Sequence, residues 1–152
     1  MSYRVLVTDD EPEKVEDIEK GLRAKGYEVL SARNGKQAIE ILQKEHIDLM
    51  VLDLVMPEAD GLEVIQAVRS NEKLHELMIF IFSGKPEIMN KISKMEVDIV
   101  FLKDDDPQLI VGEIDKRFSD SKGQPKSKRM FYDTTNPIST RLAVLKSYID
   151  YE

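Results

Sequence analysis

Near its start the chain carries Val5-Leu6-Val7-Thr8-Asp9-Asp10-Glu11, a short apolar run that ends in three consecutive acidic residues. A second apolar run, Leu49-Met50-Val51-Leu52, ends in a fourth acidic residue, Asp53. Continuous apolar runs of this length are typical of strands buried on both faces, as in a parallel sheet covered by helices. The carboxyl ends of parallel strands lie at one edge of the sheet, where Asp10 and Asp53 can meet in space. The pattern therefore predicts an acidic cluster at that edge.

An acidic cluster of this kind needs a positively charged partner. Carboxylates a few Å apart repel, and each disfavours the charged form of the other. Mg²⁺ is a suitable partner because it prefers oxygen ligands and binds through one or two carboxylates together with phosphate. Taken alone, an acidic run after a strand is more often a solvated helix N-terminus, where negative charge suits the helix dipole. The magnesium interpretation therefore depends on Asp53 joining the first three acidic residues.

Strand-like and helix-like segments alternate five times along the chain. The predicted strands are 4–8, 28–32, 49–54, 78–82 and 99–102. Apolar residues recur at helical spacing after each of them: Val15, Ile18 and Leu22; Ala38, Ile41 and Leu42; Leu62, Ile65 and Val68; Ile88, Ile92 and Met95; Val111, Ile114 and Phe118. Alternation of this kind predicts an α/β fold, a doubly wound parallel five-stranded sheet with right-handed crossovers.

Helix starts are also predicted locally. Pro12 sits where a first-turn proline is tolerated, and Asn34 is a suitable N-cap. The run 104–106 holds three aspartates directly before Pro107. That run could suggest a second cation site, but a helix N-terminal turn is the better interpretation.

Composition limits the classes of protein that fit. The 152 residues are 41% hydrophobic and 34% charged, which indicates a soluble globular chain. The net charge of −7 argues against general nucleic-acid binding, and the absence of cysteine excludes disulfides and thiolate metal sites. The longest apolar run, 77–82, is too short to cross a membrane, and no secretory signal is visible. These features predict a cytoplasmic protein.

Charge divides the chain into two parts. Residues 120–152 hold six Lys/Arg and four Asp/Glu, and subtracting these from the totals of 22 and 29 leaves 16 and 25 for residues 1–119. We expect a domain over 1–119, a polar Gly- and Pro-containing linker over 120–137, and a C-terminal amphipathic helix over 138–152. Such a helix could pack on its own domain, swap onto a second copy or dock on a partner. Whether the chain is a fragment of a longer protein is left open.

Several of these residues form an ordered set. Asp9-Asp10-Glu11-Pro12, Asp53-Leu54-Val55-Met56-Pro57 followed by Asp60-Gly61, then Ser83 and Lys103, resemble the receiver domain of two-component response regulators over about residues 3–119. The resemblance implies a flavodoxin-like (βα)5 fold. It also implies Mg²⁺-dependent transfer of a phosphoryl group to Asp53, from the phosphohistidine of a sensor histidine kinase or from a phosphotransfer protein.

The resemblance also implies a role for each site residue. Asp53 would be the phosphoacceptor and nucleophile. The implied Mg²⁺ ligands are Asp9, Asp10, Asp53 and the backbone carbonyl of Val55. Lys103 would supply a cation to the phosphoryl oxygens, and Ser83 would donate its hydroxyl to one of them. The chain would catalyse at most its own phosphorylation and dephosphorylation.

The sequence departs from the family at two places. In the family, the lysine at this place is usually followed by proline, whereas in this chain Lys103 is followed by Asp104. We therefore expect a more mobile loop and a less firmly placed lysine. Three residues before the lysine, the family often has a Tyr or Phe that swings inward, whereas this chain has Val100. Phe101 should point to the opposite face of the strand, so Val100 leaves open whether a ring switch operates.

Two functional hypotheses of different classes remain. The first is a response regulator that switches a downstream protein partner through the face formed by the fourth helix, fifth strand and fifth helix, with homodimerisation left open. The second is a phosphorylation-independent pseudo-receiver that acts as a protein-interaction module. Neither requires direct contact with nucleic acid or membrane. A dehalogenase-type phosphohydrolase is set aside, because it would need an acid where Val55 stands.

Overall fold

The computed structural model describes residues 3–54, 61–83, 97–120 and 125–127. Its five strands form one parallel sheet in the order β2-β1-β3-β4-β5. The strands are β1 (Arg4–Thr8), β2 (Glu28–Ala32), β3 (Leu49–Leu52), β4 (Met78–Ser83) and β5 (Ile99–Leu102). The predicted strands are confirmed, with the third ending two residues earlier than expected and the fourth one residue later.

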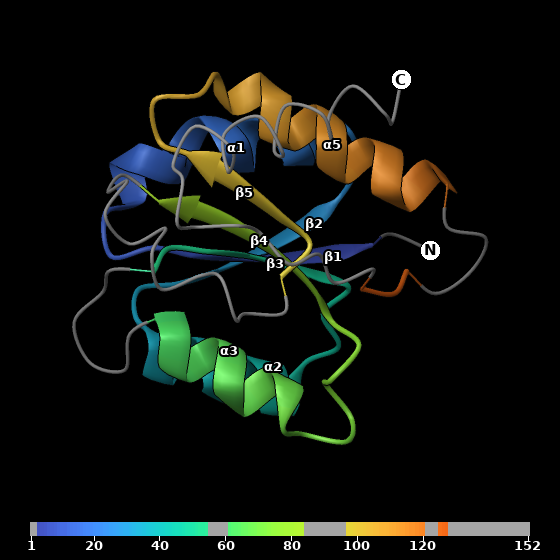
Figure 1. Cartoon of the computed structure of the whole chain (residues 1–152). Helices are drawn as coiled ribbons and strands as arrows, with labels where there is room; N and C mark the ends of the chain where they lie inside the picture. Colours follow the sequence, from blue (N-terminus) through green and yellow to red (C-terminus); the bar gives the residue numbers. More distant parts are fainter. Residues whose placement is uncertain (1–2, 55–60, 84–96, 121–124, 128–152) are drawn as a thin grey trace, which may run out of the picture.

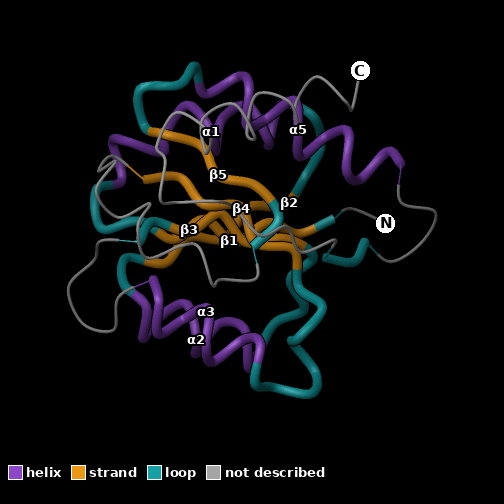
Figure 2. The backbone as a smooth tube through the Cα atoms, viewed as in Figure 1, coloured by secondary structure: helices purple, strands orange, loops and turns teal. Residues whose placement is uncertain are grey.

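Four described helices cover the sheet: α1 (Pro12–Ala24), α2 (Gly35–Lys44), α3 (Gly61–Arg69) and α5 (Pro107–Asp120). Figure 1 shows α1 and α5 on one face of the sheet and α2 and α3 on the other. The tube view gives the same three layers, with the strands between the two helix pairs (Figure 2). The predicted doubly wound α/β fold is therefore confirmed. The helix expected around 88–95 and the one expected over 138–152 lie outside the described residues.

Local sequence explains where these helices begin. Pro12 occupies the first turn of α1, where its missing N–H costs nothing. The side chain of Asn34 accepts a hydrogen bond from the Gln37 N–H and so caps α2. The carboxylate of Asp106 accepts a 3.0 Å hydrogen bond from the Gln108 N–H at the start of α5. The helix-start interpretation of the 104–106 run is thus confirmed.

The strands are apolar because both faces of the sheet are covered. Every residue of β3 and β4 is buried, including Leu49, Met50 and Phe80 with no exposed surface. Burial of this kind stabilises the fold by roughly 1.5–3 kcal/mol for each large aliphatic or aromatic side chain. The only described strand with exposed residues is β2, where Glu28 and Ser31 are exposed, and it lies at an edge of the sheet.

Aromatic and polar contacts tie α5 to the amino-terminal end of the sheet. The rings of Tyr3 and Phe118 stack with centroids 4.3 Å apart, and Tyr27 meets Phe118 edge-on at 5.1 Å. The Tyr27 hydroxyl donates a hydrogen bond to Asp115. Where α1 and α5 cross, a Cβ on Gly21 would lie 3.0 Å from the side chain of Val111. The position of α5 is therefore fixed by contacts along its length.

Residues 125–127, the described part of the predicted linker, also contact the domain. Ser127 donates its backbone N–H to the carbonyl of Glu76 and its hydroxyl to the buried carboxylate of Asp98, at 2.9 and 2.8 Å. The same Asp98 oxygen accepts a 2.9 Å hydrogen bond from the Ile79 N–H and lies 3.8 Å from Arg69. This short segment is thus held at the amino-terminal edge of β4 and β5. The boundaries at 119, 120 and 137 stay predictions.

Candidate functional site

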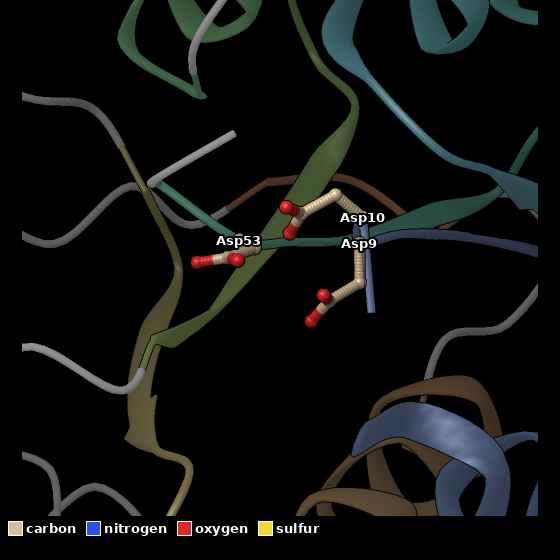
Figure 3. Close-up of side chains that lie close together, drawn as sticks. All are labelled: Asp9, Asp10 and Asp53. Carbon is tan, nitrogen blue, oxygen red and sulfur yellow. The ribbon is translucent and has the colours of Figure 1, made fainter. Parts of the chain in front are cut away.

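The acidic residues predicted to meet do so at the carboxyl-terminal edge of the sheet. One carboxylate oxygen from each of Asp9, Asp10 and Asp53 lies within 4.8 Å of the other two. Figure 3 shows the three side chains together where β1 and β3 end. Asp9 and Asp53 are 3% and 4% exposed, whereas Asp10 is the most accessible of the three. The cluster therefore has two buried carboxylates and one that faces solvent.

Strand pairing brings these carboxylates together. Thr8 at the end of β1 pairs with Leu52 at the end of β3, so the residues that follow them are neighbours. The backbone confirms this, because the Asp53 N–H donates to the Thr8 carbonyl at 3.0 Å. Asp9 also turns its own Oδ1 back to accept a 2.9 Å hydrogen bond from the Glu11 N–H. One oxygen of Asp9 is thereby used to start the chain turn into α1.

Lys103 bridges the two buried carboxylates. Its Nζ atom lies 2.8 Å from Oδ2 of Asp9 and 3.3 Å from Oδ2 of Asp53. Burial opposes the charge on this ammonium, but the hydrogen bond to Asp9 and the two nearby carboxylates outweigh it, so the pKa of Lys103 lies above its usual value. Burial raises the pKa of Asp9, and Lys103 and the Glu11 N–H only partly oppose this. A positive charge thus stands ready where a phosphoryl group on Asp53 would need one.

Ser83 completes the site from the neighbouring strand. It ends β4, between the ends of β3 and β5, and is 2% exposed. Its Oγ atom has no hydrogen-bond partner among the residues that the structure describes. Leaving a buried hydroxyl without a partner costs free energy, about 1–3 kcal/mol. A ligand oxygen that accepted this hydrogen bond would recover that cost.

The turn after β5 is closed by hydrogen bonds on both sides of Lys103. The expectation of a more mobile loop stays a prediction. The Lys103 N–H donates to the Ser83 carbonyl at 2.9 Å. The Asp105 N–H donates to the Leu102 carbonyl, and an Asp105 carboxylate oxygen accepts from the Leu102 N–H, both at 2.9 Å. No peptide bond in the described residues is cis. The proline seen in the family is therefore replaced here by a hydrogen-bonded turn.

The residues before Lys103 lie as strand alternation predicts. Val100 is fully buried, and Phe101 packs against Phe80 with ring centroids 6.3 Å apart. The guanidinium of Arg117, on α5, lies 5.5 Å from the centre of the Phe80 ring. Phe101 therefore faces the side covered by α5, away from Val100. No aromatic ring occupies the Val100 position.

Gly61 supports the backbone that follows the proposed phosphoacceptor. A Cβ at Gly61 would lie 2.6 Å from the carbonyl oxygen of Asp53 and 2.7 Å from Cα of Leu54. Both neighbours are backbone atoms, which cannot move aside cheaply. The Asp60-Gly61 pair was visible in the sequence, but this close approach was not. Val55, whose carbonyl is expected to bind the metal, lies outside the described residues.

The donor set fits a hard divalent cation. Three carboxylates offer oxygen atoms only, one of them accessible to solvent, as Mg²⁺ prefers. No cysteine is present in the chain, and no histidine belongs to the cluster. The acidic cluster could therefore hold a metal ion of the magnesium type beside Asp53.

Comparison with known proteins identifies the family. The family model described as response regulator receiver domain matches residues 5–115, most of the chain. This chain belongs to that family. The match covers Asp9, Asp10, Asp53, Ser83 and Lys103. It ends within α5, before the segment 125–127.

Solved structures agree with this assignment. The signal receiver domain of a signal transduction histidine kinase from Syntrophus aciditrophicus superposes with a TM-score of 0.74 at 21% identity, covering 81% of this chain and 95% of that one. A response regulator receiver protein from Pseudomonas putida gives a TM-score of 0.69 at 27% identity, covering 76% and 98%. These likenesses are of the receiver fold.

One curated relative is much longer than this chain. A "Probable cyclic di-GMP phosphodiesterase" of Vibrio cholerae serotype O1 is 40% identical over 81 residues, which is 53% of this chain and 18% of that protein. The aligned part is therefore a small portion of the relative. The activity in its name is that of the whole relative.

Within the described ranges of the present chain, no helix is both long and apolar enough to cross a membrane.

Proposed function

We propose that this chain is a phospho-accepting signalling switch. Asp53 takes a phosphoryl group from the phosphohistidine of a sensor kinase or phosphotransfer protein, and the change at the site alters a downstream protein partner. The observation that carries the proposal is Lys103, whose ammonium bridges Asp9 and Asp53. The buried Ser83 ends the neighbouring strand β4. A nucleophile and a cation thus lie together at the edge of the sheet where Ser83, whose hydroxyl has no hydrogen-bond partner among the described residues, ends the adjacent strand.

The proposed reaction uses groups at this edge of the sheet. A carboxylate oxygen of Asp53 forms a bond to phosphorus while the phosphorus–nitrogen bond of phosphohistidine breaks. The imidazole nitrogen keeps the bonding electron pair and takes a proton from solvent. Lys103 balances charge that develops on the phosphoryl oxygens, and Ser83 donates a hydrogen bond to one of them. Water later cleaves the acyl phosphate and restores the carboxylate.

Magnesium belongs to the same proposal. Asp9, Asp10 and Asp53, with the carbonyl of Val55, would hold it. When bound, Mg²⁺ supplies positive charge that offsets repulsion between the acidic site and an incoming phosphoryl group. Asp10 is the best placed of the three to bind from solvent, because Asp9 is already paired with Lys103 and Glu11.

The proposed partners are proteins. A kinase or phosphotransfer protein would supply phosphate, and a downstream target or a second copy of this chain would read the change. We infer that the chain turns over no separate substrate and that it works in the cytoplasm. The acidic balance of residues 1–119 supports protein partners over nucleic acid.

The decisive test is intact mass after incubation with Mg²⁺ and a small-molecule phosphodonor. The native chain should gain one phosphoryl group, and Asp53→Asn should gain none. Asp104→Asn is the matched control, because Asp104 is an exposed aspartate one residue beyond Lys103. The native protein could instead be folded and bind Mg²⁺ but gain no mass, either with the phosphodonor or with a panel of histidine kinases. That outcome would favour the phosphorylation-independent module.

A further inference from the structure

The turn between β5 and α5 contains three consecutive aspartates whose side chains have different surroundings. Asp104 is exposed to solvent. Asp106 accepts a hydrogen bond from the Gln108 N–H and caps α5. Asp105 instead reaches back to the strand and bonds to the backbone of Leu102, the residue before Lys103. The middle aspartate is therefore the one linked to the site.

Leu102 needs such a partner because β5 lies at the edge of the sheet. Its neighbour Lys103 donates its N–H to Ser83 on β4. Because successive residues of a strand direct their N–H and C=O groups to opposite sides, those of Leu102 point away from β4, to the open edge of the sheet. There the Asp105 carboxylate accepts from the Leu102 N–H, and the Asp105 N–H donates to the Leu102 carbonyl, each at 2.9 Å. Asp105 thus satisfies both groups that an adjacent strand would otherwise pair.

The backbone at Lys103 is consequently held from two sides. Ser83 bonds to it from β4, and Asp105 closes the turn from the open edge. A lysine side chain has about 2 kcal/mol of rotamer entropy, so its reach to a fixed point depends on where its Cα is held. The Nζ of Lys103 arrives between Asp9 and Asp53 with 14% of the side chain exposed. A fixed Cα therefore favours this arrangement over the many others open to the side chain.

From these contacts we propose that Asp105 is a positioning residue for phosphoryl transfer, acting through Lys103. The inference rests on the proposed function. Both bonds to Leu102 go to neutral peptide groups, so they need an acceptor oxygen and a turn-forming backbone. Asparagine at position 105 should therefore substitute for aspartate, whereas alanine should not.

The first experiment measures the rate of phosphorylation by a small-molecule phosphodonor at saturating Mg²⁺. Misplacement of a catalytic group by an ångström can cost a hundredfold, so we expect Asp105→Ala to lower the rate about tenfold. Asp105→Asn and Asp104→Ala should stay within about twofold of the native chain. The Mg²⁺ affinity of Asp105→Ala should not fall, because Asp9, Asp10 and Asp53 are intact. A rate loss in Asp104→Ala equal to that in Asp105→Ala would overturn the proposal.

Asp106→Ala separates positioning from stability. It removes the α5 cap and one negative charge, so it should lower the unfolding midpoint while leaving the rate per folded molecule within about twofold. Asp105→Ala should lower the rate at comparable stability. If the rate simply follows the unfolding midpoint in both variants, Asp105 has no positioning role.

Amide hydrogen exchange keeps this inference distinct from the proposed function. The Leu102 N–H should exchange about tenfold faster in Asp105→Ala than in the native chain and Asp105→Asn. If the native chain accepts no phosphoryl group, the proposed function fails, and this exchange measurement still decides whether Asp105 holds the backbone beside Lys103. Unchanged exchange would overturn the positioning role by itself.

Discussion

The Nζ atom of Lys103 lies 2.8 Å from Oδ2 of Asp9, closer than its 3.3 Å approach to Oδ2 of Asp53. The lysine therefore offsets the charge of a buried carboxylate directly after β1 as well as that of the proposed phosphoacceptor directly after β3. Its positive charge also lies beside the carboxylates that a divalent cation would bind. Lysine and metal are thus expected to compete in the resting site and to act together once a phosphoryl group is present.

Lys103→Ala should separate these two effects. Removing the ammonium makes the cluster more negative, so Mg²⁺ should bind more tightly, by roughly 1 kcal/mol or about fivefold in Kd after allowing for solvent screening. Phosphorylation should become at least about tenfold slower, because the charge that stabilises the transferring group is lost. Titration calorimetry gives the affinity, and intact mass against time gives the rate. Lys44→Ala, an exposed lysine at the end of α2, is the control and should change neither.

Gly61→Ala should destabilise the domain by about 1–3 kcal/mol or more, because the added methyl would overlap backbone atoms of Asp53 and Leu54. Urea unfolding followed by circular dichroism gives the free energy of unfolding. Gly21→Ala is the matched control, since the atoms nearest its methyl belong to the Val111 side chain, at 3.0 Å, rather than to backbone, and alanine favours the helix by up to about 1 kcal/mol. Equal losses in the two variants would show that the contact with Asp53 is unimportant.

Tyr27→Phe should reduce the dependence of stability on alkaline pH. Burial, then the hydrogen bond to Asp115, raise the pKa of Tyr27 well above its ordinary value of 10.0. Between pH 10 and the folded pKa, the unfolded chain loses the tyrosine proton first, so stability present below pH 10 is lost as pH rises. The free energy of unfolding, measured from pH 8 to 11, should fall less steeply in the variant. Parallel curves for the two proteins would contradict the assignment.

Ser127→Ala should lower the free energy of unfolding by about 1–2 kcal/mol, since it removes a hydrogen bond to the fully buried carboxylate of Asp98. Residues 125–127 should also become more accessible to proteases. Ser119→Ala removes an exposed serine from the last turn of α5 and is expected to change stability by less than about 0.5 kcal/mol. A Ser127→Ala variant as stable as Ser119→Ala would mean that the contact with Asp98 contributes nothing measurable.

Much of the fold could be read from hydrophobic pattern. Both buried strands that end in Thr8 and Leu52 are continuous apolar runs, and in a parallel sheet this is enough to bring Asp9 and Asp53 to one edge. The helix caps at Asn34 and Asp106 were predictable because capping depends on residues only a few positions apart. These strands and helix caps were therefore predictable from local and periodic sequence patterns.

Contacts between distant side chains were not predictable in the same way. Nothing in the sequence pattern shows that Lys103 lies nearer Asp9 than Asp53, because that choice depends on the rotamers of a long side chain. The hydrogen bonds by which Asp105 closes the turn were also not predicted, because the run 104–106 was interpreted as a helix start. Likewise, the polar composition around Ser127 gives no hint of its bond to Asp98, 29 residues away in the chain.

Strand β5 has four residues, with Asp98 directly before it and Lys103 directly after it. At about 3.3 Å per residue, the strand is roughly 13 Å long, and different contacts lie at its two ends. One end holds the cation beside Asp53, and the other holds the carboxylate that binds Ser127. A short strand that is already extended can lengthen very little if Lys103 moves along the strand axis. A shift of Lys103 along the strand axis is therefore expected to reach the hydrogen bond between Asp98 and Ser127 at the other end.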